Sequence, residues 1–103
     1  MSNYELIKTA IKNRECVTGT YKGHVREMTP HVIGLKNGRK QALFYQYGGT
    51  SSSGLSPNPV KNWRCIPIDE ITNLSTNKDD FQTANNHSSS QTCVDIIDAE
   101  VDY

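Results

Sequence analysis

The 103-residue chain lacks any long apolar run. A membrane-spanning helix needs about 20 consecutive apolar residues, so we expect no membrane span. The first residues also lack the apolar segment of a secretory leader. We therefore expect a protein that works in the cytoplasm and does not contact a membrane.

Cysteine is scarce, with three residues far apart in the sequence and no C-x-x-C pair: Cys16, Cys65 and Cys93. An odd number at this spacing favours buried thiols in a reducing cytosol over a disulfide framework or a zinc site. His24 and His31 have no third ligand at a supportive spacing. We expect free thiols, no metal ion and no cofactor.

Groups that would perform catalysis are also missing. Asp69 and Glu70 are adjacent, so in a strand they would face opposite sides, which does not suit acid–base chemistry. The Gly/Ser segment 48–54 lacks the Gly-Lys-Ser/Thr ending of a Walker loop. We expect that the protein is not an enzyme.

The formal net charge is zero, but the charges are unevenly distributed. Residues 1–76 hold ten Lys and Arg against five Asp and Glu, whereas residues 77–103 hold one against six. A basic body favours phosphate-bearing partners, with an ordinary mixed surface as the alternative.

The N-terminal segment has the pattern of a helix over residues 3–14. Ser2 followed by Glu5 is a capping box. Four apolar side chains then form one stripe: Leu6, Ile7, Ala10 and Ile11. Such a short helix is not stable alone, so the stripe should cover a sheet.

From Glu15 onward the pattern becomes that of short strands. We expect strands at 15–21, 25–35, 40–47 and 62–68, and a closing turn or strand at 69–74. Pro30 cannot donate a ladder hydrogen bond, so a bend or bulge is expected there. Asn37-Gly38 predicts a type I′ hairpin turn.

These elements predict a mainly β fold with one N-terminal helix, a small and strongly bent antiparallel barrel of about five strands. The barrel domain covers residues 1–76. Residues 77–103 form an acidic polar tail, interpreted as a linker or disordered segment, with a short edge strand at 93–101 left open. Because so small a barrel buries little surface, we expect a homodimer.

The best candidate site combines the loop after residue 47 with Arg64. Gly48, Gly49 and Gly54 let the backbone adopt positive φ, and residues 51–53 add hydroxyl groups. Such a loop can aim several N–H groups at one anion, while the Arg64 guanidinium supplies a planar fork of donors. The alternative is an ordinary loop, with Arg64 paired to Asp69 or Glu70.

Aromatic side chains flank this loop. Tyr45, Tyr47 and Trp63 either stack on nucleic-acid bases or belong to the core, and the sequence leaves both open. Phe44 lies on the opposite face of its strand and is expected in the core. Arg26 and His31, on the long strand, are candidates for phosphate contacts.

Over residues 5–75 the chain resembles the WYL-domain family. The similarity rests on Asn13-Arg14, Tyr21, Arg26 to Pro30, Gly38, Leu43-Phe44-Tyr45, and Trp63-Arg64 leading into Ile68-Asp69-Glu70-Ile71. The family's Trp-Tyr-Leu signature falls near residues 40–43 and reads Lys-Gln-Ala-Leu here, and no helix-turn-helix accompanies it. The resemblance implies an Sm-like small barrel that senses nucleotides or short nucleic acids. It would do so through Tyr21, Arg26, His31, Tyr45 and Arg64.

The sequence thus predicts a non-catalytic ligand-binding module, a sensor, regulator or sequestering protein. Its ligand would carry phosphate, as a nucleotide or a short single-stranded oligonucleotide. The predicted ligand-binding residues are Tyr21, Arg26, His31, Tyr45, Gly49, Ser51, Ser52, Ser53, Trp63 and Arg64. The alternatives are a protein–protein interaction or oligomerisation module without a small ligand, and sequence-tolerant nucleic-acid binding by the basic face.

The acidic tail suggests one further hypothesis. Its carboxylates, Asp95, Asp98, Glu100 and Asp102, would fold back and compete with an anionic ligand. The basic groups they would meet are Lys22, Arg26, Arg39 and Lys40.

Overall fold

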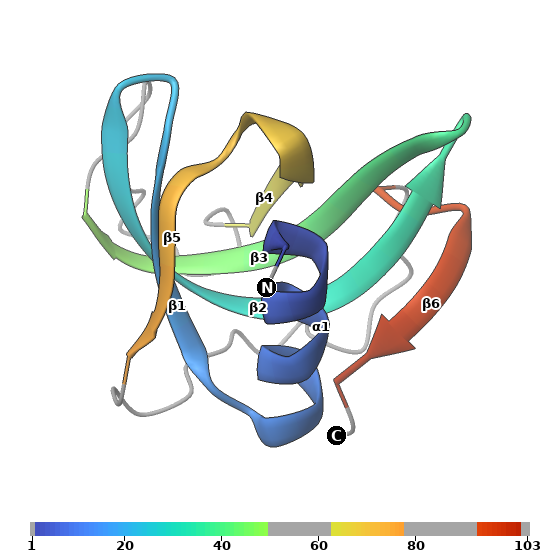
Figure 1. Ribbon diagram of the computed structural model, residues 1–103, viewed down its shortest axis with the longest axis horizontal. Helices are drawn as coiled ribbons and strands as arrows, with labels where there is room; N and C mark the ends of the chain where they lie inside the picture. Colours follow the sequence, from blue (N-terminus) through green and yellow to red (C-terminus); the bar gives the residue numbers. More distant parts are fainter. Residues whose placement is uncertain (1, 50–62, 78–92, 102–103) are drawn as a thin grey trace.

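The computed structural model describes residues 2–49, 63–77 and 93–101 (Figure 1). Within these ranges the fold is mainly β, with one N-terminal α-helix and six strands. In chain order the elements are α1 (Asn3–Asn13), β1 (Cys16–Tyr21), β2 (His24–Lys36), β3 (Arg39–Gly49), β4 (Trp63–Pro67), the 3₁₀ turn η2 (Ile68–Glu70), β5 (Thr72–Asn77) and β6 (Ile96–Glu100). No helix in the described ranges has the length and apolar composition to cross a bilayer.

The strands form one antiparallel sheet in the order β4-β3-β2-β1-β5. β2 is long enough to pair with β1 near its start and with β6 near its end, while β3 runs along its other side. Figure 1 shows the sheet curving around α1. Within the described residues the outer strands β4 and β5 do not pair with each other, so the sheet is not closed there.

The N-terminal helix forms where its capping residues predict. The Ser2 hydroxyl accepts a hydrogen bond from the backbone N–H of Glu5 at 3.2 Å, which satisfies one of the free donors of the first turn. The helix ends before Arg14, whose φ of 53° is left-handed. The Asn3 side-chain amide donates to the carbonyls of Ile68 and Ile71, and this joins the helix to η2.

The two predicted backbone features of the β2–β3 hairpin are confirmed. Asn37 and Gly38 have φ values of 51° and 81°, as a type I′ turn requires. The pairing of β2 with β3 shifts register between Pro30 and Val32, because proline has no N–H for the ladder. This irregularity leaves His31 between two regular stretches of the ladder.

The segment after β4 differs in detail from the prediction. β4 ends at Pro67, and the chain then makes the 3₁₀ turn that buries Ile68. β5 covers Thr72–Asn77 and pairs with β1, so it begins and ends later than the expected 69–74. Alternation alone did not indicate the turn, because an Ile-Pro-Ile run is equally compatible with a strand.

The core lies between α1 and the concave face of the sheet. Phe44 is fully buried near its centre, as predicted, beside the helix residues Ile7 and Ile11. The rest of this cluster comes from the strands, from η2 and from the residues that directly follow η2 and β6: Val17, Met28, Ile33, Ala42, Ile66, Ile68, Ile71 and Val101, with Ala10 from the helix. This single cluster holds the sheet and helix together.

The C-terminal segment returns to the body as β6, which pairs with Val32–Leu35 of β2. Asp95 forms an ion pair with Lys36 at 3.1 Å, and Asp98 forms one with Lys8 at 3.2 Å. The prediction that the tail carboxylates meet Lys22, Arg26, Arg39 or Lys40 is therefore wrong for Asp95 and Asp98. Pairing with the end of β2 carries them toward Lys36 and α1, whereas Arg26 lies on the other half of that strand. Asp102 lies outside the described residues.

The expectation of three free thiols is also wrong. Cys65 and Cys93 form a disulfide bond, although they are 28 residues apart in sequence. The sheet brings their Cα atoms to 5.6 Å, a separation that sequence spacing cannot reveal. Cys16 is buried and takes no part in this disulfide. A disulfide is typical of oxidising compartments, so cytoplasmic location stays a prediction.

The contact between α1 and β6 makes the attachment of β6 pH-dependent. The pKa of Tyr4 is raised from 10.0 to about 12, first by partial burial and then by the hydrogen bond that the Tyr4 hydroxyl donates to Asp98. The bonds from Tyr4 and then Lys8 lower the pKa of Asp98 below 3.8. The Tyr4 contribution to stability is therefore present below pH 10 and lost as the pH rises through about 12. The Asp98 contribution is present above about pH 4 and lost as the pH falls through its folded pKa.

Replacing Tyr4 with phenylalanine removes the first of the bonds to Asp98. We expect the pKa of Asp98 to rise toward its ordinary value, measured by NMR titration of its carboxyl carbon. Tyr47→Phe is the matched control, because the Tyr47 hydroxyl faces Asn77 on β5. An Asp98 pKa that is the same in wild type and Tyr4→Phe would contradict this account.

Candidate anion-binding site

The strand pairing divides the predicted site residues into two groups. On β4, Trp63 is opposite Tyr45 and Arg64 is opposite Phe44. Directly opposed residues share a face of the sheet, and Phe44 faces the core. Arg64 therefore belongs to the core side of the sheet, while Trp63 and Tyr45 belong to the other side.

The first group is centred on Arg26, which extends from β2 at the end of the core and is only 4% exposed. Its Nε and Nη2 donate to the backbone carbonyl of Tyr21 at 3.4 and 3.3 Å. Its Nη1 donates to the Gln46 side-chain oxygen at 3.3 Å. The guanidinium carbon lies 5.1 Å from the centre of the Tyr21 ring. These contacts orient the guanidinium between β1 and β3.

All of the acceptors that hold Arg26 are neutral. A guanidinium has five N–H groups. Within the described part of the chain, the three bonds use one N–H on each nitrogen and leave one on each terminal nitrogen. Among the described residues Arg26 forms no ion pair. A buried charge without a counter-charge is costly, so this position favours an anion.

Two further cations, Arg64 and Lys22, lie near the Arg26 guanidinium. Burial lowers the pKa of Arg26, and the positive charge of Arg64 lowers it further. The Lys22 ammonium lies 5.4 Å from the centre of the Tyr21 ring, in the turn between β1 and β2. Like charges held close together repel, and a bound anion would turn this repulsion into attraction.

Gly49 is also brought to Arg26, because it is the residue opposite Arg26 in the β2–β3 ladder. Its φ is 79°, and a Cβ at this position would lie 2.2 Å from the Val25 carbonyl oxygen. Only glycine permits this close approach of the two strands. Gly49 therefore sets the backbone beside Arg26. Ser51, Ser52 and Ser53 lie outside the described residues.

The second group is aromatic and lies on the other face. The rings of His31 and Trp63 meet edge to face with centroids 4.7 Å apart, and those of Tyr45 and Trp63 at 5.3 Å. His31 is buried, and its Nδ1 lies 3.0 Å from the Thr29 carbonyl oxygen. Tyr45 is only 7% exposed, so its ring is mainly a packing group, whereas Trp63 is half-buried.

Sequence reasoning missed Gln46 and gave Lys22 no place in the site. The signal for Gln46 was present, because strand alternation places it on the core-facing side with Phe44. A buried amide needs hydrogen-bond partners, and here its oxygen accepts from the Arg26 guanidinium while its nitrogen donates to the Gly48 carbonyl. Lys22 carried no comparable signal, since a lysine in a turn is normally solvated.

The described residues contain no group of three His, Cys, Asp or Glu side chains that could hold a metal ion. Comparison of the chain with family models, with curated proteins and with solved structures found no match. The case for a function therefore depends on the contacts of this chain alone.

Proposed function

We propose that the protein is a non-catalytic module that binds the terminal phosphate of a small ligand at Arg26 and Arg64. The observation that carries the proposal is the buried Arg26 guanidinium, which is oriented by neutral acceptors and retains two N–H groups that no described residue accepts. Phosphate suits this arrangement, because its oxygens accept charge-assisted hydrogen bonds from arginine in pairs.

The burial of Arg26 also narrows the class of ligand. A phosphate inside a polynucleotide chain has a substituent on both sides, so it reaches a guanidinium that is 4% exposed less easily than a terminal phosphate does. We therefore favour a phosphomonoester or pyrophosphate, such as the phosphate end of a nucleotide, over duplex nucleic acid. A short single strand would bind through its phosphorylated end.

The aromatic group does not extend the Arg26 site, since it lies on the other face of the sheet. Trp63, the more exposed of its rings, is a candidate stacking surface for a second contact with a base. The WYL-like and Sm-like resemblance and the cytoplasmic location belong to the same proposal. A sensor or sequestering role without catalysis is part of this proposal as well.

Isothermal titration with pyrophosphate tests the proposal. Charge-assisted hydrogen bonds contribute about 1.5–3 kcal/mol each, so Arg26→Ala and Arg64→Ala should each weaken binding roughly 10- to 100-fold. Arg26→Lys keeps the charge but loses the planar fork, and its affinity should lie between those of wild type and Arg26→Ala. A phosphomonoester should compete with pyrophosphate, whereas a dinucleotide with only an internal diester should not.

Lys12→Ala is the matched control, because Lys12 is an exposed cation on α1 and its loss changes the net charge equally. Thermal unfolding of each variant separates lost binding from lost folding. Arg64 is only half-buried, so Arg64→Ala removes one cation of the site and leaves the buried Arg26 guanidinium in place. Wild-type affinity in both arginine variants would refute the proposal.

The second candidate is an interaction module that binds no small ligand. It is favoured by Ile96 and Ile97 of β6, which are 66% and 48% exposed and would suit contact with a second copy of the chain. Such a module would show no heat of binding with pyrophosphate, so the same titration distinguishes the two candidates.

A further inference from the structure

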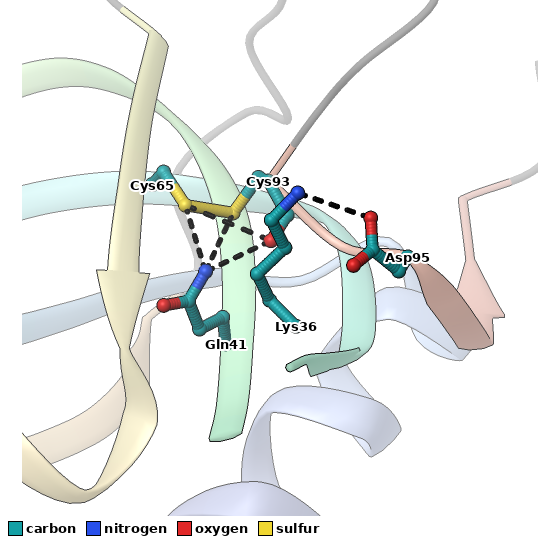
Figure 2. The surroundings of a disulfide bond; sticks show 5 residues. All are labelled: Lys36, Gln41, Cys65, Cys93 and Asp95. Carbon is teal, nitrogen blue, oxygen red and sulfur yellow. Dashed lines mark hydrogen bonds and ion pairs between the residues drawn. A yellow bond between two sulfur atoms is a disulfide. The ribbon is translucent and has the colours of Figure 1, made fainter. Parts of the chain in front are cut away.

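The disulfide is part of a junction between three segments, shown in Figure 2. Cys65 belongs to β4, Cys93 lies three residues before β6, and Gln41 belongs to β3. The Gln41 side-chain nitrogen donates to the Cys93 carbonyl oxygen at 2.8 Å and contacts the Cys65 sulfur at 3.3 Å. The covalent bond and these contacts hold β4 against the start of the C-terminal segment.

Apart from the disulfide and the burial of Ile66 in the core, β4 has few attachments within the described ranges. It has five residues and, within the described ranges, pairs only with β3. The start of the C-terminal segment has other attachments. Asp95 pairs with Lys36, its N–H donates to the Leu35 carbonyl, and β6 pairs with β2. Breaking the disulfide would therefore free β4 more than β6.

The position of Cys65 connects this junction to the proposed anion site. Cys65 directly follows Arg64 on β4, and the Arg64 side chain reaches the Trp63 carbonyl at 3.1 Å, so its guanidinium moves with this strand. Arg26, in contrast, is held by β1 and β3, which do not carry the disulfide. A change at Cys65 would displace one of the two guanidiniums and leave the other in place.

We infer that the Cys65–Cys93 disulfide is a redox switch that controls the affinity of the Arg26–Arg64 site for phosphate. The inference rests on the proposed function. With the disulfide formed, β4 holds Arg64 near Arg26 and binding is tight. A dithiol reduces the bond by giving two electrons and two protons, which yields the Cys65 and Cys93 thiols and an oxidised dithiol. β4 then loosens, Arg64 loses its position, and binding weakens.

The test compares the oxidised protein with the protein reduced by a dithiol, using pyrophosphate as the probe. Reduction should weaken binding about tenfold, the equivalent of one charge-assisted contact. The double variant Cys65→Ser/Cys93→Ser should bind like the reduced protein and show no response to dithiol. Cys16→Ala, which removes the buried thiol that takes no part in the disulfide, should keep the full response.

Hydrogen exchange of the ligand-free protein supplies a second readout. On reduction, amides of β4 should lose protection while those of β2 and β3 keep it, which shows local loosening rather than unfolding. Equal affinities before and after reduction, with Arg26→Ala still impaired, would overturn the switch and leave the proposed function standing. If neither the oxidised nor the reduced protein binds pyrophosphate, the proposed function fails. In that case, hydrogen exchange of the β4 amides that is unchanged by reduction would separately overturn the switch.

Discussion

Replacing Phe44 with alanine is expected to lower the free energy of unfolding by about 3–5 kcal/mol. Phe44 has no exposed surface, and it lies in the middle of β3, opposite Pro30 on one side and Arg64 on the other. The change removes the largest fully buried side chain and leaves a cavity between the sheet and α1. Because the cavity is enclosed on both sides, the surrounding groups can collapse into it only partly.

Urea unfolding followed by circular dichroism measures this loss. Val25→Ala serves as the control, since Val25 is 55% exposed and its truncation should change the free energy by no more than about 0.5 kcal/mol. A loss below about 1 kcal/mol for Phe44→Ala would mean that this residue is not the centre of the core.

Replacing Gly34 with alanine is expected to detach β6 from β2. A Cβ at Gly34 would lie 1.9 Å from the Ile96 carbonyl oxygen and 2.6 Å from a methyl carbon of Val94. Backbone cannot move aside as a flexible side chain does, so the C-terminal segment must shift away. Overpacking of this kind costs about 1–3 kcal/mol.

Hydrogen exchange of the β6 amides tests this prediction, together with the overall unfolding free energy. Gly48→Ala is the matched control, because the atoms nearest to its Cβ would belong to the flexible Glu27 side chain, at 3.2 Å, rather than to backbone. We expect the control to keep β6 protected. Full protection of β6 in Gly34→Ala would contradict the pairing of β6 with β2.

Features that depend on local chemistry could be predicted from the sequence. The Ser2 cap, the Asn37-Gly38 turn and the irregularity at Pro30 each follow from the properties of one or two residues. The helix and strands β1 to β4 were predicted with boundaries close to those observed, because alternation and a capping box are strong local signals, whereas β5 lies later than expected. The mainly β class follows from these elements.

The arrangement of the site could be predicted only in part. Trp63 and Arg64 are consecutive in a strand, so alternation already implied that they face opposite sides, and the sequence interpretation did not apply this to them. The meeting of Arg26 with Gln46 could not be predicted, because it depends on a register shift beside Glu27. The same holds for the disulfide and for the partners of Asp95 and Asp98, which depend on where β6 pairs.

The most direct test of the anion site is an NMR titration of the wild-type protein with pyrophosphate, observed at the arginine Nε–H signals. We expect the Arg26 and Arg64 signals to shift along one saturation curve. The signal of Arg39, which is exposed on the β2–β3 hairpin, should stay in place. An Arg26 signal that does not move as pyrophosphate is added, or that moves only in step with Arg39, would contradict the claim that this buried guanidinium binds phosphate.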